Sequence, residues 1–342
     1  MGEPTFMRRE IAEIPAATAR LLDHGGEAIA AAAQALAARD PALIVTIARG
    51  SSDHASAFLK YAIELTAGVP VASIGPSIGS IYNRPLKLER AAAIAISQSG
   101  KSPDLVAMSQ AARQGGALTI GITNTQGSPL TEVAEHAVLL EAGIERSVAA
   151  TKTFVSSVVA GLAILAHWQN DRALQRALSE LPELFEQAIA CDWSPLVPAL
   201  DGPTSLFVLG RGPTLAIASE AALKFKETCS LHAEAYSAAE VMHGPVAIVQ
   251  PGFPILTLAA RDASEASLVD AADRLAGQGA DAFITSAGAR SATRLPFASG
   301  THPLTDALAL IVSFYAFIEE LARHRGLDPD KPHNLNKITE TV

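Results

Sequence analysis

The sequence carries the same order of apolar and polar segments twice, with a constant offset between the two copies. Arg49 and Arg211 define this offset, since each follows an apolar stretch and is followed by a glycine and then a helix-forming stretch. The same offset added to Ser97, which ends another apolar stretch, gives Ala259, which follows the mainly apolar residues 255–258. Self-similarity at a fixed spacing is typical of a duplicated structural unit. We therefore predict two copies of one domain.

Short strand-like segments alternate with helical segments in both copies, which predicts parallel βαβ units with helices on both faces of a sheet. The predicted fold is α/β, with two tandem three-layer domains, N-terminal helices and an irregular C-terminal tail. Ligands of such sheets bind at the carboxyl ends of the strands. The predicted boundaries are 1–40 for the N-terminal helices, 41–175 for the first domain, 176–200 for a linker helix, 201–325 for the second domain and 326–342 for the tail.

Apolar runs and their breaks place the individual elements. In the first copy we expect strands at 43–47, 70–74, 91–96, 117–121 and 137–140, with a long helix at 152–168. In the second copy we expect strands at 206–209, 254–259 and 282–285, with helices at 215–227 and 306–323. Residues 7–17 and 27–39 are expected to be helices, and the alanine-rich second one should pack against other elements because it has few large side chains.

The acidic balance of the chain excludes one class of partner. Its formal charge is −9 and its pI is about 5.5, so no basic stripe is available to neutralise nucleic-acid phosphates. Two cysteines, Cys191 and Cys229, form neither a disulfide framework nor a zinc site, which favours a reducing compartment. The N-terminus lacks an apolar signal core, and residues 154–166, the longest apolar stretch, are too short to cross a bilayer. We expect a cytoplasmic protein that binds neither nucleic acid nor membrane.

One turn between a predicted strand and helix is rich in hydroxyl groups. A serine at the N-cap and a proline at the first helical position favour the start of a helix directly after it. Such a turn presents amide donors, hydroxyl groups and the positive end of a helix, which together suit a phosphate monoester. About four or five hydrogen bonds, each worth roughly 1.5–3 kcal/mol, could hold the ligand without a metal. The residues of the turn are Ser97, Gln98, Ser99, Gly100, Lys101 and Ser102, before Pro103.

Two other interpretations of this turn compete with a phosphate site. Gly100-Lys101-Ser102 resembles the end of a nucleotide-binding loop, but Ala95 stands where that motif needs a glycine. An ordinary turn of small polar residues is the other alternative. The second copy has Ala259-Ala260-Arg261-Asp262 at this place and no hydroxyl groups, so we expect a phosphate site in the first copy alone.

Acid–base groups are concentrated in the second copy. Glu220, Lys224 and Glu227 follow the i, i+4, i+7 spacing that places side chains on one face of a helix. A solvated Glu–Lys pair is the alternative, but this helix follows a glycine-rich turn at a strand end, where ligands bind. His243, before Gly-Pro, lies in a tight turn and could instead cap local structure, and His232 is expected to be a structural hydrogen-bonder.

Taken together, these motifs resemble those of the sugar isomerase (SIS) superfamily, and within it the isomerase half of glucosamine-6-phosphate synthase. The resemblance covers residues 41–342 and implies two tandem SIS domains of the flavodoxin-like kind. Eight segments carry it, at 48–52, 97–100, 148–152, 210–212, 220–227, 232–236, 243–245 and 334–337.

The resemblance implies a role for each candidate residue. The phosphate would be bound by Ser97, Gln98, Ser99 and Ser102, and the sugar by Ser52 and Val148, with Ser51 and Glu220 as further binding residues. Glu227 resembles the carboxylate that moves a proton between C1 and C2 of the opened hexose, and Lys224 lies beside it. His243, which acts across a homodimer in this family, resembles the residue that opens the ring. Lys337, in a tail that could fold over the site or be disordered, resembles the lysine that approaches the sugar carbonyl.

The chain also departs from the synthase. Gly2 stands where the synthase has its glutaminase nucleophile, so we expect no release of ammonia from glutamine. Lys101 and Pro103 make the phosphate turn similar to that of SIS-type glucosamine-6-phosphate deaminases. The expected reaction converts glucosamine 6-phosphate and water to fructose 6-phosphate and ammonia, without a metal or redox cofactor. The alternatives are a synthase-like aminotransferase module, a deglycase acting on an amino-acid adduct, a galactosamine-6-phosphate deaminase, a plain aldose–ketose isomerase and a non-catalytic sugar-phosphate sensor.

Overall fold

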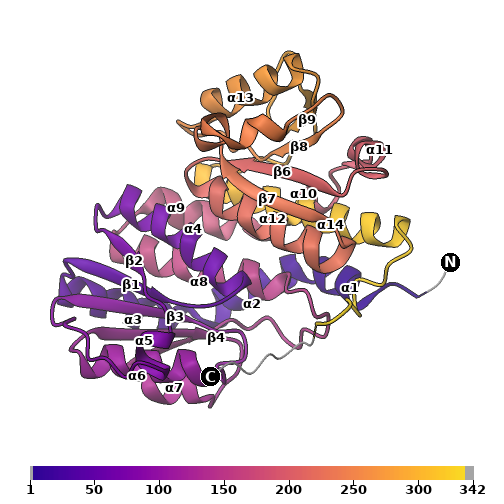
Figure 1. The fold of residues 1–342 in the computed structure, drawn as a ribbon. Coiled ribbons are helices and arrows are strands. Elements are labelled where there is room, and N and C mark those ends of the chain that lie inside the picture. Colours follow the sequence, from indigo (N-terminus) through magenta and orange to yellow (C-terminus); the bar gives the residue numbers. More distant parts are fainter. Residues whose placement is uncertain (1–2, 336–342) are drawn as a thin grey trace. The chain divides into compact units, whose positions relative to one another are not determined.

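The computed structural model describes residues 3–335, which fall into two compact units (Figure 1). The first unit consists of residues 14–145 and 152–179. The second unit consists of residues 3–13, 146–151 and 180–335.

The first unit contains a parallel sheet in the order β2-β1-β3-β4-β5. The strands are β1 (Leu43–Ile47), β2 (Val71–Ser73), β3 (Ala91–Ile96), β4 (Leu118–Thr123) and β5 (His136–Leu139). The helices are α2 (Ile14–His24), α3 (Gly26–Arg39), α4 (Ser51–Thr66), α5 (Ser77–Ser80), α6 (Pro103–Gln114), α7 (Pro129–Val133), α8 (Lys152–Trp168) and α9 (Arg172–Ser179). Helices α4 and α8 lie on one side of the sheet and α6 and α7 on the other, so every residue of the central strand β3 is buried (Figure 1).

The alanine-rich helix α3 packs against α8, as expected of a helix that cannot form a core by itself.

The strand order has a direct consequence for ligand binding. It reverses direction between β1 and β3, so the chain leaves these two neighbouring strands toward opposite faces of the sheet. Open α/β sheets bind their ligands at this switch point, beside the carboxyl ends of the two strands.

The second unit repeats this sheet in the order β10-β9-β8-β6-β7. The strands are β6 (Ser205–Gly210), β7 (His232–Ser237), β8 (Pro254–Thr257), β9 (Asp281–Ile284) and β10 (Thr293–Arg294). The helices are α1 (Phe6–Ala12), α10 (Leu181–Ile189), α11 (Val197–Leu200), α12 (Pro213–Cys229), α13 (Glu265–Gly277) and α14 (Pro303–His324). Short 3₁₀ segments are η1 (Ser194–Leu196), η2 (Glu240–His243) and η3 (Pro245–Ile248).

The predicted duplication is confirmed by the strand order and by a detail of the backbone. With β6 matched to β1 and β8 to β3, the two sheets have the same order of strands. Gly50 and Gly212 correspond to each other in the repeat, and they precede α4 and α12 with φ/ψ of 56°/−133° and 61°/−137°. Positive φ of this kind favours glycine. The predicted α/β fold with two tandem copies of one domain is therefore present.

Two elements differ from the sequence prediction. The helix expected at 7–17 is two helices, α1 and α2, which belong to different units. The sequence predicts no strand at 232–236, but these residues belong to β7, which pairs with β6. None of the helices within residues 3–335 combines the length and the apolar character needed to cross a membrane.

Candidate functional site

The predicted phosphate turn follows β3 directly and leads into α6. Ser97 is buried, and its hydroxyl and carbonyl oxygens accept from the Gly100 amide at 3.1 and 3.2 Å. Gly100 has φ of 63°, and a β-carbon there would clash with the Ser128 hydroxyl group. Its carbonyl accepts from the Leu130 amide at 3.0 Å. The turn is therefore rigid, and its central position requires glycine.

The start of α6 leaves donors available beside this turn. Ser102 occupies the N-cap position and Pro103 the first helical position, as predicted. The Ser102 side chain, however, makes no capping hydrogen bond to an early amide of α6. Since the first amides of a helix have no partner within the helix, this end can donate to an anion.

Gln98 connects the turn to a cavity in the first unit. Its carbonyl accepts from the Asn124 amide at 3.0 Å, which ties the turn to the end of β4. The cavity has a volume of about 460 Å³, and its lining includes Gln98, Asn124, Thr125, Gln126, Glu141 and Glu145. It lies at the carboxyl ends of β3, β4 and β5, the edge of the sheet where a ligand is expected.

Ser51 and Ser52 reach the same edge from the neighbouring strand. They are half-buried at the start of α4, after β1, which pairs with β3 up to Ile47 and Ala95. The structure therefore brings two predicted groups together, the serines after β1 and the turn after β3.

An ion pair that the sequence interpretation did not identify joins the loop after β1 to α6. Arg49 follows β1, and its Nε atom donates to Oδ2 of Asp104 in the first turn of α6. The Asp104 side chain is fully buried, whereas that of Arg49 is 46% exposed. The repeat had singled out Arg49, but its partner is 55 residues away in sequence and shows no local signal.

In the second unit, Glu220, Lys224 and Glu227 lie on one face of α12, as predicted. Lys224 Nζ is 2.5 Å from Glu227 Oε2 and 3.2 Å from Glu220 Oε1. The side chains of Lys224 and Glu220 are fully buried and that of Glu227 is 20% exposed. The Tyr315 hydroxyl, from α14, donates to Glu220 Oε1 at 3.0 Å. This burial rules out the solvated surface pair.

Charge compensation keeps Lys224 protonated. Burial alone would lower the pKa of its ammonium group, but the carboxylates of Glu220 and Glu227 outweigh burial and raise that pKa above its ordinary value. Lys224 therefore pairs with the Glu227 carboxylate as a cation.

The remaining candidates lie at several places in the second unit. His243 is exposed at the end of η2, and Gly244 after it has φ of 147°, in agreement with the predicted tight turn. His232 is exposed on β7, with Nδ1 3.2 Å from the Ser205 hydroxyl, which fits a structural role. Val148 is half-buried in residues 146–151. Lys337 lies outside the described residues.

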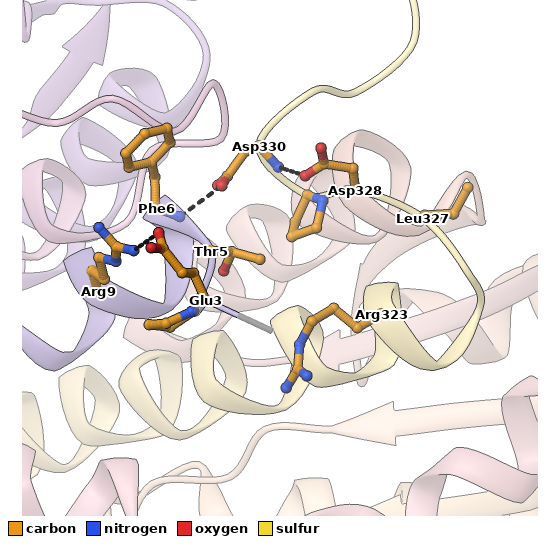
Figure 2. Close-up of a pocket in the computed structure, with 10 residues that line it drawn as sticks. Glu3, Thr5, Phe6, Arg9, Arg323, Leu327, Asp328 and Asp330 are labelled. Carbon is orange, nitrogen blue, oxygen red and sulfur yellow. Dashed lines mark hydrogen bonds and ion pairs between the residues drawn. The ribbon is translucent and has the colours of Figure 1, made fainter. Parts of the chain in front are cut away.

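Figure 2 shows a cavity of about 430 Å³ in the second unit, between the start of α1 and the segment after α14. Asp330 accepts from the amides of Phe6 and Met7 at 2.6 and 2.9 Å. Thr5 accepts from the Arg8 amide at 3.0 Å. A carboxylate at a helix N-terminus is favoured by both the unpaired amides and the helix dipole. Asp330 therefore anchors the beginning of the C-terminal tail to α1.

Removal of this cap should weaken the anchor measurably. Asp330→Ala is expected to lower the free energy of unfolding by about 1–2 kcal/mol, because two amides of α1 lose their acceptor. Urea denaturation would measure the change, with Asp328→Ala as the control, since the side chain of the exposed Asp328 accepts from the Asp330 amide alone among the described residues. Equal effects of the two substitutions would contradict a specific role for Asp330.

The comparisons with known proteins agree with this geometry. A family model described as the SIS domain matches residues 39–167 and 200–311. The chain belongs to the SIS domain family. The predicted resemblance is thereby confirmed, and the two matched ranges follow the two sheets.

Two known proteins are similar to this chain over almost its whole length. The glutamine–fructose-6-phosphate aminotransferase of Symbiobacterium thermophilum is 35% identical over 98% of this chain and 59% of its own length. This chain thus spans less than two thirds of that relative. A solved candidate phosphosugar isomerase from Silicibacter pomeroyi DSS-3 is 54% identical, with a TM-score of 0.93, over 96% of this chain and 100% of its own.

Two more distant solved structures share the fold. The C-terminal domain of the glucosamine-fructose-6-phosphate aminotransferase of Francisella tularensis has a TM-score of 0.85 at 24% identity, over 97% of this chain and 99% of its own. The glucosamine-6-phosphate deaminase of Thermotoga maritima has a TM-score of 0.76 at 20% identity, over 98% of this chain and 100% of its own.

Proposed function

We propose that this protein is a phosphosugar aldose–ketose isomerase that converts glucosamine 6-phosphate and water to fructose 6-phosphate and ammonia. The observation that carries the proposal is Glu227, a partly exposed carboxylate fixed by the fully buried Lys224. A single base of this kind can take a proton from one carbon and return it to the next. The similarity to an isomerising aminotransferase and to a candidate phosphosugar isomerase supports the same reaction class.

The proposed steps balance without a cofactor. His243 assists opening of the sugar ring, since an imidazole can exchange protons near neutral pH. Glu227 takes the proton from C2 of the open-chain 2-amino aldose and returns it to C1, while one proton leaves the amine nitrogen and one is added to O1. Together these transfers convert the C1 aldehyde to an alcohol and the C2 amine to an imine. Water then hydrolyses the imine to the C2 ketone and releases ammonia. Lys337 would approach the carbonyl carbon, and Lys224 keeps Glu227 oriented throughout.

The proposal includes the binding residues and the assembly. Ser97, Gln98, Ser99 and Ser102 bind the phosphate, and Ser51, Ser52, Val148 and Glu220 complete the binding residues. The protein acts in the cytoplasm as a homodimer in which His243 serves the site of the partner subunit. The predicted domain limits, 41–175 and 201–325, belong to the same proposal.

Incubation of the purified protein with glucosamine 6-phosphate tests the reaction directly. We expect ammonia and fructose 6-phosphate to appear in equal amounts. Galactosamine 6-phosphate, an amino-acid adduct of a hexose phosphate, and fructose 6-phosphate with ammonium should be assayed in parallel. Turnover of one of these, with no ammonia from glucosamine 6-phosphate, would replace the proposed substrate, and turnover of none would favour a sensor.

Replacement of one hydroxyl group in the phosphate turn should affect binding more than turnover. Ser99→Ala is expected to raise KM for glucosamine 6-phosphate about 10- to 100-fold, because one hydrogen bond to a charged group is worth roughly 1.5–3 kcal/mol. The kcat value should stay within a few-fold. Steady-state kinetics would measure both, with Ser179→Ala as a control, an exposed serine at the end of α9 in the same unit. An unchanged KM would remove Ser99 from the phosphate site.

A further inference from the structure

The Arg49–Asp104 ion pair lies at the switch point of the first sheet. Arg49 is the second residue after β1 and Asp104 the second residue of α6, which follows β3. The chain leaves β1 and β3 toward opposite faces of the sheet, so this pair spans the place between them. That place is where open α/β sheets bind their ligands.

The two members of the pair differ in their surroundings. Asp104 is fully buried, and its Oδ1 accepts from the Leu105 amide at 2.9 Å while its Oδ2 accepts from Arg49 Nε. Arg49 is nearly half exposed, and within residues 3–335 its terminal Nη atoms have no hydrogen-bond partner. Asp104 thus fixes the guanidinium group by one nitrogen and leaves the rest of its donors toward solvent. A guanidinium group presents its donors in a fork that fits phosphate oxygens.

The guanidinium group of Arg49 lies close to the phosphate turn. Asp104 comes two residues after Ser102, so the guanidinium group that it binds lies at the end of α6 that faces the turn. The turn itself offers mainly neutral donors, whereas a phosphate monoester carries nearly two negative charges at neutral pH. A fixed cation at this end supplies the charge that hydroxyl and amide groups lack.

The second copy of the domain provides an internal comparison. It keeps an arginine, Arg211, at the place of Arg49, but Ala266 stands at the place that corresponds to Asp104, as the second residue of α13. The same copy also lacks the hydroxyl-rich turn. The carboxylate that fixes the arginine and the phosphate turn therefore occur together in one copy and are both absent from the sequence of the other.

We propose that Arg49 binds the substrate phosphate directly and that Asp104 is the residue that positions it. The inference rests on the proposed phosphosugar function but does not depend on which sugar is attached. A purely structural alternative exists, in which Arg49 only neutralises the buried Asp104.

Paired substitutions separate these two roles. We expect Arg49→Met to raise the dissociation constant for inorganic phosphate, and KM for the phosphosugar, about 10- to 100-fold, with kcat within a few-fold. Arg49→Lys should lie between the wild type and Arg49→Met, because it keeps the charge without the fork. The double variant Arg49→Met/Asp104→Asn removes both charges, so it should unfold closer to the wild-type denaturant midpoint than Arg49→Met alone. Its affinity for phosphate should remain as low as that of Arg49→Met.

Calorimetric titration with inorganic phosphate and denaturant unfolding would be measured on the same full-length preparations. Wild-type phosphate affinity in the double variant, or in a folded Arg49→Met variant, would overturn the inference, as would a wild-type protein that does not bind phosphate. If phosphate affinity depends on Arg49 but glucosamine 6-phosphate is not converted, the proposed reaction fails and this inference stands.

Discussion

Glu227→Gln is expected to lower kcat for glucosamine 6-phosphate by about 10²–10⁴-fold, the usual contribution of a general acid–base group. The glutamine has nearly the shape of glutamate and can still accept a hydrogen bond from Lys224, which lies 2.5 Å from Glu227 in the structure. It cannot, however, take the proton from C2. Since the proposed phosphate-binding residues belong to the first unit and Glu227 to the second, binding of the product fructose 6-phosphate should stay close to that of the wild type. Steady-state assays and calorimetric titration would measure the two properties.

A second glutamate in the same unit gives the control for this substitution. Glu234, exposed on the edge strand β7, should tolerate replacement by glutamine with little change in kcat. A Glu227→Gln variant that turns over at the wild-type rate would contradict the proton-transfer role. If both substitutions reduced turnover equally, a general effect of charge would be the better explanation.

The parts of the fold that the sequence predicted are those with local signals. Strands buried on both faces appear as short continuous apolar runs, and the recurrence of matching runs at a constant offset indicates the duplication. The strand–turn–helix geometry of residues 91–114 was predictable because serine, glycine and proline have strong positional preferences between a strand and a helix. Strand β7 was missed because it lies at the edge of its sheet, where most of its side chains are at least partly exposed and no apolar run forms.

The parts that could not be predicted depend on contacts between distant segments. The i, i+4, i+7 spacing placed Glu220, Lys224 and Glu227 on one face of α12, but spacing alone does not say whether that face points to solvent or into the protein. The answer depends on α14, whose Tyr315 is 95 residues from Glu220 in sequence. The same holds for Asp330, which caps α1 from 324 residues away. Sequence periodicity carries no information on such pairs.

The burial of the Glu220–Lys224 ion pair leads to the largest expected effect on stability. Lys224→Met should lower the free energy of unfolding by about 3–5 kcal/mol, because it leaves the carboxylate of Glu220 buried without its cation. Methionine has a similar length and is apolar, so lost packing contributes little. Denaturant unfolding at neutral pH would measure the loss, with Lys226→Met as the control, since Lys226 is exposed on the same helix.

The pH dependence of the stability difference between the wild type and Lys224→Met follows from the direction in which the pKa of Lys224 is shifted. The pKa of Lys224 in the folded protein lies above the ordinary value of 10.5, because the neighbouring carboxylates outweigh the effect of burial. Its stabilising contribution is therefore complete at pH values below 10.5 and decreases only as the pH rises through the folded-state pKa. The free energies of unfolding of the wild type and Lys224→Met should differ by a constant amount from about pH 7 to 9 and converge only well above that range.

Adding Glu220→Gln to Lys224→Met should restore part of the stability, because an uncharged amide no longer needs the cation. A double variant as unstable as Lys224→Met would show that packing, and not the buried charge, accounts for the loss.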